Sequence, residues 1–477
     1  MSDRAHYDWV VIGAGPAGQK AALQGAKEGR RVLVVDQARA PGGECVNRGT
    51  IPSKTLRETA QHFAALERRS AGVLRCELSP DVQLTGLMAR LDEVRDAHAR
   101  TLTGQLGREG VEFIQARARF VGERALELRL PGRGKLDVTA DTVFIATGSR
   151  PRTPDDVPVD HEHVLDSDSI LSLVYLPRSL IVLGAGVIAV EFASIFAALG
   201  VAVTIVDRYP LPVGFMDADL CRGFVRAFEA RGGRFLGGTK YRRVAADGLG
   251  QVEVELESGE VLRAEKVLSA LGRQANLKGL ELAATGLAPT ERGLLTVDPH
   301  GQTTVPGIYA CGDVVGPPAL ASTSMEQGRR AARHALGRPV PDEELGMVPC
   351  GIYTIPELAS VGLTEAQARE RHGAVLVGRA PFRELARGMI QGAEDGFLKL
   401  IADPLGERIL GCHVLGDGAA ELVHLAEVAM LGNLPPVTFV DRTFNFPTLA
   451  EAYRVAALDV LAQRTAAPPA ADAARAA

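Results

Sequence analysis

The residues best suited to chemistry lie in one short stretch of the 477-residue chain, GGECVNRGTIPSK, which runs from Gly42 to Lys54. This stretch holds a thiol at Cys45 and a hydroxyl at Thr50. A disulfide requires two sulfurs at close range, and thiol–disulfide exchange proceeds by attack of a thiolate on sulfur, so a hydroxyl cannot take part in either. Any redox chemistry of this segment must therefore proceed without a disulfide between these two positions.

A glycine-rich turn near the start of the chain predicts a dinucleotide-binding fold. It contains Gly13, Gly15 and Gly18, after an apolar strand and before a helix of small residues. The first glycine permits a tight turn, the second lets the backbone approach a pyrophosphate, and the third brings helix and strand together. Asp36 ends the next expected strand, where a carboxylate accepts hydrogen bonds from a ribose.

A second turn of the same kind contains Gly184, Gly186 and Ala189. Alanine suits the third position, which only needs to be small. Asp207 repeats the acidic position and suits the free 2′-hydroxyl of NAD. Arg208 beside it has two readings, an attractant for the 2′-phosphate of NADP or a solvated loop arginine. Two such folds predict two bound dinucleotides.

The central stretch and the two turns resemble the flavin-dependent pyridine nucleotide-disulfide oxidoreductases, whose redox segment reads GGxCxNxGCxPSK. In that family the two cysteines relay electrons from the flavin, and Thr50 stands at the second of them. The resemblance implies an α/β fold with two Rossmann-like dinucleotide-binding domains, for FAD and NAD(P), and a C-terminal α+β dimerisation domain. It also implies that Glu191 pairs with Lys54 beside flavin N5, which makes these two the expected catalytic residues.

Three further stretches carry the resemblance. Residues 143–151 look like the ATGSxP turn, residues 267–276 resemble the AxGRxPN return to the first domain, and the strand end at Asp313 resembles the position that holds the flavin ribityl chain. The residues expected to contact the dinucleotides are Gly13, Gly15, Gly18, Asp36, Gly43, Cys45, Thr50, Lys54, Thr147, Gly148, Gly184, Gly186, Ala189, Asp207, Arg208, Gly272 and Asp313.

The motifs also predict the domain boundaries, and helical periodicity predicts helices over 56–69 and 87–107. The expected parts are a first FAD-binding segment at 1–151, an NAD(P)-binding domain at 152–275, the FAD-binding return at 276–346, an interface domain at 347–464, and a disordered tail at 465–477.

A second departure from the family lies near the C-terminus. The disulfide reductases of the family close with HPTxxE, whereas this chain reads FPTLAE, with Phe446 at the histidine position and Glu451 retained. Phenylalanine has no titratable proton and cannot do acid–base work. The two departures together resemble the transhydrogenases of the family. They imply reversible, ping-pong hydride transfer between NADPH and NAD through FAD.

The residues alone are compatible with several other functions. An NAD(P)H-dependent quinone reductase or diaphorase would use the same residues, and a flavoprotein subunit with a structural role is a further possibility. Thr50 and Phe446 disfavour a dihydrolipoamide dehydrogenase. Cys45 is either a small buried side chain or a lone reactive thiol that forms a sulfenic acid.

Composition limits the partners and the compartment. The net charge is −5 and the lysines and arginines are scattered, so we expect no nucleic-acid or membrane partner. No run of 18 apolar residues occurs, and six cysteines without a CxxC pair suit a reducing compartment, so we expect a cytoplasmic protein. We expect no metal site, substrates NAD(H) and NADP(H), and a homodimer or larger homo-oligomer.

Overall fold

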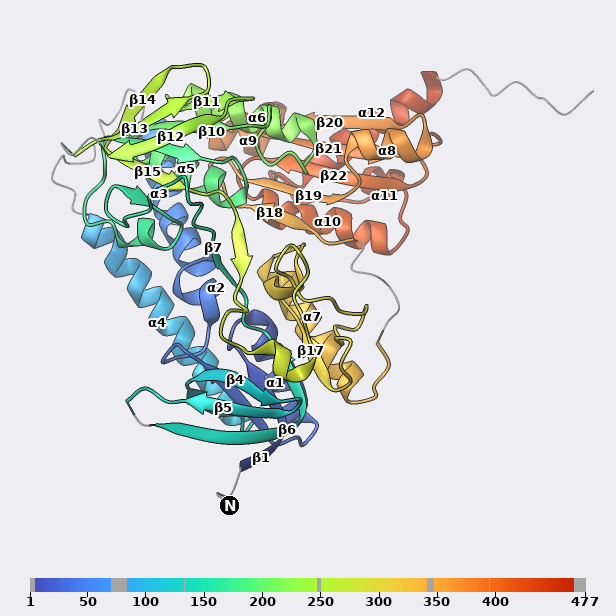
Figure 1. Ribbon diagram of the computed structural model, residues 1–477. Helices are drawn as coiled ribbons and strands as arrows, with labels where there is room; N and C mark the ends of the chain where they lie inside the picture. The colour runs from blue at the N-terminus through green and yellow to red at the C-terminus, as the bar shows by residue number, and fades with distance from the viewer. Residues whose placement is uncertain are drawn as a thin grey trace, which may run out of the picture.

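The chain forms three lobes, each built around its own sheet (Figure 1). This computed structural model describes residues 5–69, 84–132, 134–246, 250–340, 347–393 and 395–466. In the view of Figure 1 the first lobe lies at the bottom with the N-terminus, the second at the upper left, and the C-terminal lobe at the upper right.

A seven-stranded sheet forms the core of the first lobe. Its strands are β1 (Ala5–Ile12), β2 (Val32–Asp36), β3 (Glu112–Gln115), β4 (Arg117–Gly122), β5 (Ala125–Arg129), β6 (Lys135–Ile145) and β17 (Ile308–Ala310). The order is β3-β2-β1-β6-β5-β4 with β17 on β6, and β3, β2, β1, β6 and β17 run parallel. Parallel strands are covered on both faces, which explains the apolar run that ends β1 and the one that makes up most of β2.

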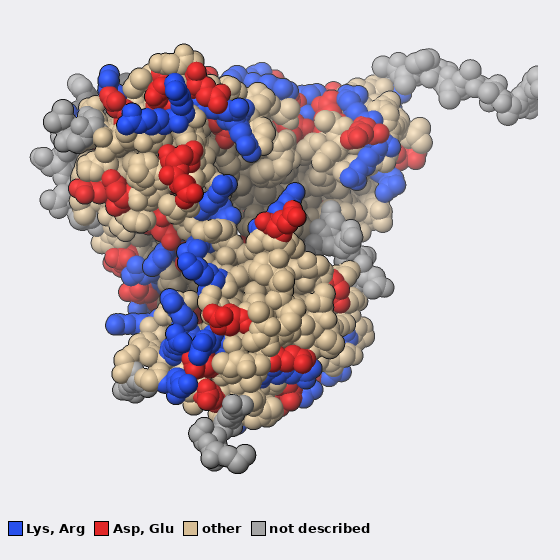
Figure 2. Space-filling model, in the orientation of Figure 1, with Lys and Arg blue, Asp and Glu red and all other residues tan. Residues whose placement is uncertain are grey.

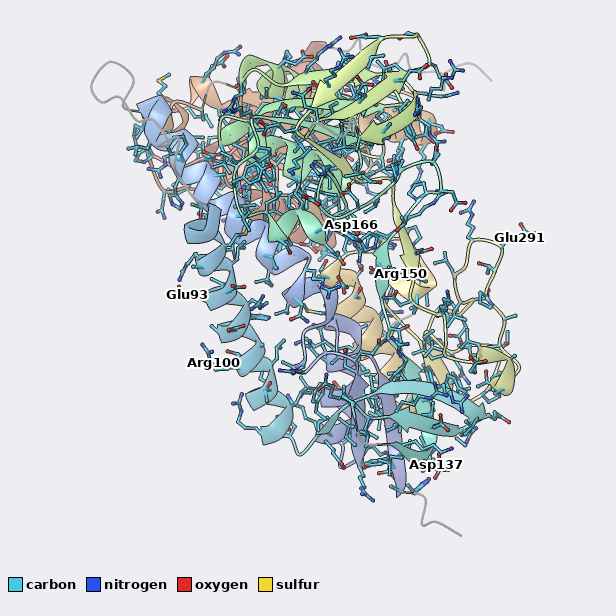
Figure 3. All side chains as sticks on the ribbon, turned by 60° about the vertical axis from the view of Figure 1, so that its left-hand side comes forward. Glu93, Arg100, Asp137, Arg150, Asp166 and Glu291 are labelled. Carbon is cyan, nitrogen blue, oxygen red and sulfur yellow. The ribbon has the colours of Figure 1, made fainter. Side chains whose placement is uncertain are left out.

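Two groups of helices accompany this sheet. They are α1 (Pro16–Lys27) with α7 (Ala321–Ala335), and α2 (Gly43–Asn47) with α3 (Thr50–Arg69) and α4 (Leu84–Arg108). The first pair packs so closely that a Cβ at Gly328 would lie 2.1 Å from the carbonyl oxygen of Ala17. The helices predicted at 56–69 and 87–107 are confirmed, although both begin earlier than expected. Glu93 and Arg100 point outward from α4 (Figure 3).

The second lobe has a parallel sheet in the order β11-β10-β9-β15-β8 and an antiparallel sheet in the order β12-β13-β14. Its strands are β8 (Val164–Leu165), β9 (Ser179–Leu183), β10 (Ala202–Asp207), β11 (Arg234–Gly237), β12 (Tyr241–Ala246), β13 (Val252–Leu256), β14 (Val261–Ala264) and β15 (Lys266–Ser269). Its helices are α5 (Val187–Ala198) and α6 (Ala218–Ala230). Two short strands, β7 (Ser149–Pro151) and β16 (Arg273–Ala275), pair where the chain crosses between the first two lobes.

The third lobe is an antiparallel sheet in the order β18-β19-β22-β21-β20 with helices against it. Its elements are β18 (Cys350–Ile352), β19 (Leu358–Gly362), β20 (Leu376–Pro381), β21 (Phe397–Ala402), β22 (Ile409–Leu415), α8 (Glu365–His372), α9 (Ala386–Gln391), α10 (Ala419–Leu431), α11 (Val437–Asp441) and α12 (Glu451–Ala466). The disordered tail was expected to begin at residue 465, but α12 continues to Ala466. The rest of the expected tail, residues 467–477, lies outside the described residues.

The three lobes confirm the predicted fold class, which is two dinucleotide-type α/β lobes followed by an α+β lobe. Within the described part of the chain, no helix has both the length and the apolar character needed to cross a membrane. The described residues also contain no group of three or more His, Cys, Asp and Glu side chains placed to bind a metal ion.

Candidate functional site

A cavity of about 670 Å³ is lined by residues of all three lobes. Figure 2 shows the surface hollowed between them. The predicted site residues that line it are Gly13, Gly15, Asp36, Gly43, Cys45, Thr50, Lys54, Thr147, Gly148, Gly186, Glu191, Gly272 and Asp313. Gly18, Gly184, Ala189, Asp207 and Arg208 do not line this cavity. Gly18 packs within the first glycine turn, and the other four belong to the second turn and the strand end beside it.

The first glycine turn lies directly against the redox segment. Gly13 has φ +107°, and a Cβ there would lie 2.2 Å from the carbonyl oxygen of Ala146. A Cβ on Gly43 would lie 2.7 Å from Cα of Gly15. Helix α1 begins at Pro16 without a side-chain cap, so its free N–H groups face the cavity at a point suited to a phosphate.

The two acidic strand ends have a structural role that the sequence did not reveal. Asp36 accepts hydrogen bonds from the backbone N–H groups of Ala14 and Ala38, at 2.7 and 2.8 Å. Asp207 repeats this arrangement with Ala185 and Tyr209, both at 2.7 Å. Each carboxylate therefore fixes its own glycine turn, in addition to the ribose contact expected from the motif.

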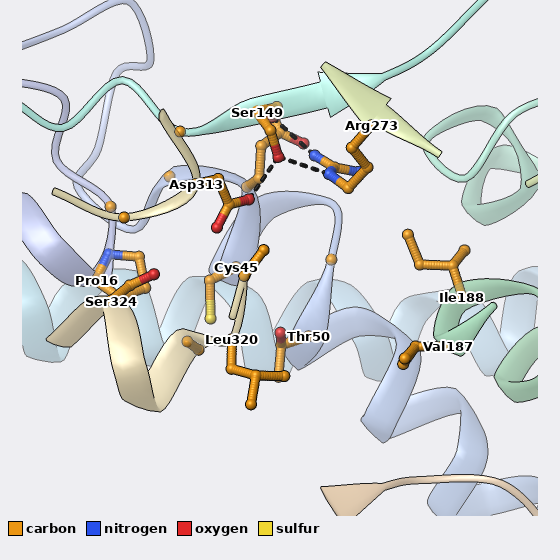
Figure 4. A pocket seen from close by; sticks show the side chains of 18 of the residues that line it. Pro16, Cys45, Thr50, Ser149, Val187, Ile188, Arg273, Asp313, Leu320 and Ser324 are labelled. Carbon is orange, nitrogen blue, oxygen red and sulfur yellow. Dashed lines mark hydrogen bonds between the residues drawn. The ribbon is translucent and has the colours of Figure 1, made fainter. Parts of the chain in front are cut away.

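Cys45 and Thr50 lie side by side in the cavity (Figure 4). Cys45 lies on α2, and Thr50 begins α3. Burial raises the pKa of the Cys45 thiol, although the Thr50 hydroxyl and the Lys54 ammonium act in the opposite direction. A protonated thiol is a poor nucleophile, which favours the inert reading of Cys45 over the reactive one.

The raised pKa of Cys45 leads to a testable prediction. Replacing Cys45 with serine should leave the rate of the hydride transfer expected from the sequence within about twofold of the wild-type rate, because this half-buried thiol acts as a small side chain. The measurement is the steady-state rate with NADPH and an NAD analogue of shifted absorbance. A loss of most of the activity would instead support a reactive thiol.

Lys54 and Glu191 form the predicted ion pair, with Nζ 2.6 Å from Oε2. The Glu191 side chain is only 5% exposed, and its other oxygen accepts the backbone N–H of Tyr353 at 3.0 Å. The Lys54 ammonium also lies 5.0 Å from the centre of the Tyr353 ring. The pair thus joins α3 of the first lobe to α5 of the second and contacts the third.

Helix α3 makes two further contacts with the third lobe. The Arg57 guanidinium lies 2.8 Å from Oε1 of Glu357 and also donates to the carbonyl oxygen of Thr354. One turn later, Gln61 donates to Asp417 at 2.9 Å. One helix therefore carries Thr50 and Lys54 at the cavity and also fixes the position of the other two lobes.

Asp313 belongs to a hydrogen-bonded chain that the sequence did not predict (Figure 4). The Ser149 hydroxyl donates to Oδ2 of Asp313 at 2.5 Å, and Arg273 donates to both the hydroxyl and the carbonyl oxygen of Ser149, at 2.8 Å each. Ser149 and Arg273 lie on β7 and β16, within the two crossover motifs noted in the sequence. The positions of Ser149 and Arg273 in those two motifs were the only sequence signal that could have predicted their part in the site.

Three buried polar atoms at the cavity have no hydrogen-bond partner within the described residues: Glu44 Oε2, Thr147 Oγ1 and Ser269 Oγ. Burial, followed by the charge of Asp168, raises the pKa of Glu44. Buried polar groups normally find partners, so these atoms indicate a polar ligand. Together with the glycine turn and the open end of α1, the residues present fit a dinucleotide.

The sequence family places this site in a known class. Residues 7–328 match the family described as pyridine nucleotide-disulphide oxidoreductase, and residues 348–457 match its dimerisation domain. The chain therefore belongs to the pyridine nucleotide-disulphide oxidoreductases and is an enzyme of that family, which confirms the resemblance seen in the sequence.

Its relatives in sequence carry a more specific name. A protein of Mycobacterium tuberculosis named soluble pyridine nucleotide transhydrogenase is 42% identical over 456 residues, which cover 95% of this chain and 97% of that protein. A protein of the same name from Hahella chejuensis is 40% identical over 466 residues, covering 95% and 98%.

Two solved structures share the whole fold. LpdA from Mycobacterium tuberculosis superposes with a TM-score of 0.87 at 28% identity, over 95% of this chain and 99% of that one. RclA from Escherichia coli, described as an HOCl-induced flavoprotein disulfide reductase, gives 0.85 at 29% identity over the same shares.

Proposed function

We propose that this protein is an FAD-dependent enzyme that moves hydride reversibly between NADPH and NAD. The observation that carries the proposal is the pair Cys45 and Thr50, which meet in a cavity that retains Lys54 and Glu191. A hydroxyl at the second position excludes a disulfide there, so electrons must leave by another route. The names of the sequence relatives support the same activity.

Each part of the cavity has a role in this proposal. A bound FAD would supply a two-electron carrier that accepts hydride from one nicotinamide and returns it to another. The first glycine turn and the N-terminus of α1 would hold its pyrophosphate, and Asp313, itself held by Ser149, would hold its ribityl chain. Lys54 places a positive charge at the cavity, and Glu191 orients that charge.

The second glycine turn would bind the nicotinamide nucleotide substrate. Gly186 and Val187 begin α5 at the cavity, again without a side-chain cap, so this helix N-terminus suits the pyrophosphate of NAD(H) or NADP(H). One pocket would then serve donor and acceptor in turn, because NAD(H) and NADP(H) present the same pyrophosphate and nicotinamide groups to it. Holding each nicotinamide in place is the main contribution of the protein.

Initial-rate kinetics with NADPH and an NAD analogue of shifted absorbance test this function. We expect parallel double-reciprocal lines, because the first product leaves before the second substrate binds. Intersecting lines would contradict the shared pocket. Rapid turnover of lipoamide or glutathione disulfide would contradict the absence of a sulfur route. A quinone that is reduced much faster than the NAD analogue would identify the protein as a quinone reductase.

Asp207 gives a second prediction about the nucleotide site. Replacing Asp207 with alanine should raise the use of NADP(H) relative to NAD(H), because the carboxylate suits a 2′-hydroxyl and repels a 2′-phosphate. The measurement is the ratio of kcat/KM for NADPH and NADH, where we expect a shift of about tenfold. Asp207→Asn also removes the charge but keeps an oxygen for one of the two backbone N–H groups, those of Ala185 and Tyr209, so it disturbs the turn less and should shift the ratio in the same direction. An unchanged ratio would remove Asp207 from the site.

We further propose that the protein is a homodimer joined through its third lobe. Residues 348–457 match the dimerisation domain of the family, and that region carries several exposed apolar side chains. They include Leu425, Val428, Leu431, Leu434 and Phe446, the last of which is 74% exposed. Exposed apolar residues gathered in one region are typical of protein interfaces.

A further inference from the structure

The backbone of the turn after β10 is hydrogen-bonded on both sides of Tyr209. The N–H of Tyr209 donates to Oδ1 of Asp207 at 2.7 Å, and its carbonyl oxygen accepts the N–H of Gly238 at 3.0 Å. Both backbone polar groups of Tyr209 are therefore bonded, although the residue is 57% exposed. The other oxygen of Asp207 accepts the N–H of Ala185 in the second glycine turn, so the carboxylate ties the backbone of Tyr209 to that turn.

Arg208 rests on this ring. Its guanidinium carbon lies 4.8 Å from the ring centre of Tyr209, and Nη2 donates to the Tyr209 hydroxyl at 2.9 Å. Arg208 forms no ion pair with a carboxylate in the described part of the chain. A guanidinium has five N–H donors, so most of its donors stay available beside the carboxylate of Asp207.

Orientation decides how well an arginine binds phosphate. Its planar fork donates two parallel hydrogen bonds, and fixing its plane in advance reduces the conformational entropy lost on binding. We propose that Tyr209 is a specificity-determining residue, which holds Arg208 oriented for the 2′-phosphate of NADP(H) at a site whose Asp207 suits NAD(H). This inference rests on the proposed function, because it requires both nucleotides to use the same pocket.

Calorimetric binding of 2′,5′-ADP and 5′-AMP to the full-length protein tests the role of Tyr209 without hydride transfer. Replacing Tyr209 with alanine should raise the Kd of 2′,5′-ADP by about fivefold, as expected for the loss of an exposed cation–π contact. The Kd of 5′-AMP should change by less than about twofold, because that ligand lacks the 2′-phosphate. Tyr209→Phe keeps the ring but loses the hydroxyl that accepts from Arg208, so its Kd for 2′,5′-ADP should lie between those of wild type and Tyr209→Ala.

Two further variants complete the test. Arg208→Ala should weaken 2′,5′-ADP binding by about tenfold, and adding Tyr209→Ala should then have no further effect, because the ring acts through Arg208. Tyr175 is the matched control, since it is 46% exposed and lies 5.3 Å from the Lys266 ammonium in the same lobe. Tyr175→Ala should leave both affinities unchanged.

Three results would overturn the role of Tyr209. They are an unchanged 2′,5′-ADP affinity in Tyr209→Ala, an equal loss of 5′-AMP affinity, and an effect that persists without Arg208. The proposed function can fail separately. A protein that shows the expected binding pattern but transfers no hydride to NAD would overturn that function and leave the role of Tyr209 standing.

Discussion

Replacing Lys54 with methionine should lower the rate of hydride transfer by about 100-fold, because the variant loses the positive charge at the cavity. The Lys54 side chain is 25% exposed, whereas its partner Glu191 is 5% exposed, so the variant also leaves a nearly buried carboxylate without its cation. We expect the free energy of unfolding to fall by about 2 kcal/mol, less than for a fully buried pair. Stopped-flow absorbance and urea unfolding measure the two effects.

A double variant separates the two effects of losing Lys54. Adding Glu191→Gln removes the unpaired negative charge, so Lys54→Met with Glu191→Gln should recover most of the stability but none of the rate. Lys135 pairs with the buried Glu127 at 3.0 Å, and neither residue lines the cavity. Lys135→Met is therefore the matched control, and it should leave the rate unchanged. A Lys54→Met variant with the wild-type rate would show that the charge has no part in the reaction.

Replacing Lys399 with methionine should destabilise the protein by about 3–5 kcal/mol at neutral pH, since it breaks a buried ion pair on one side only. The Lys399 side chain is 2% exposed and lies 2.7 to 2.8 Å from the carboxylates of Asp217, Asp219 and Glu365. Asp217 is equally buried and caps α6 by accepting the N–H of Asp219. Urea unfolding at pH 7 measures the loss of stability.

The effect of Lys399 should depend on pH in a defined direction. Burial alone would raise the pKa of Asp219 and Glu365, but their hydrogen bonds from Lys399 hold both pKa values below the ordinary range. A lowered pKa contributes stability above about pH 4, the unfolded value, and that stability is lost as the pH falls. The difference between wild type and Lys399→Met should therefore shrink below about pH 4.

Lys240 is the matched control for Lys399, because its ion pair lies on the surface. Lys240 pairs with Glu257 at 3.8 Å on the surface, and Lys240→Met should change the free energy of unfolding by less than about 1 kcal/mol. Equal stability of Lys399→Met and wild type at pH 7, or a difference that grows in acid, would contradict the assigned role of the cluster.

The sequence predicted the fold well because the signals were local. The glycine turns, the strands before them and the helices after them lie within short windows, and the parallel sheets follow from that order. The ion pair of Lys54 and Glu191 was predictable across 137 residues only because each partner stands at a motif position. Without the family pattern, nothing in the sequence distinguishes Lys54 or Glu191 from an ordinary surface charge.

The parts that sequence reasoning missed depend on contacts between distant residues. Lys399 interrupts an apolar strand, and its partner Asp217 lies 182 positions away with no motif around it. The backbone contacts of Asp36 and Asp207 were missed for another reason, since the motif assigns those carboxylates to the ligand. The support of Arg208 by Tyr209 depends on side-chain direction, which neighbouring positions in a sequence do not reveal.

Helix α3 also limits how this enzyme can be recombined with its relatives. A chimaera that imports a foreign second lobe keeps Lys54 but must supply a matching carboxylate at position 191. One that imports a foreign third lobe must supply partners for Arg57 and Gln61. Exchange of lobes among such proteins should therefore give an active enzyme only when the residues of α3 and their partners on the imported lobe are exchanged together.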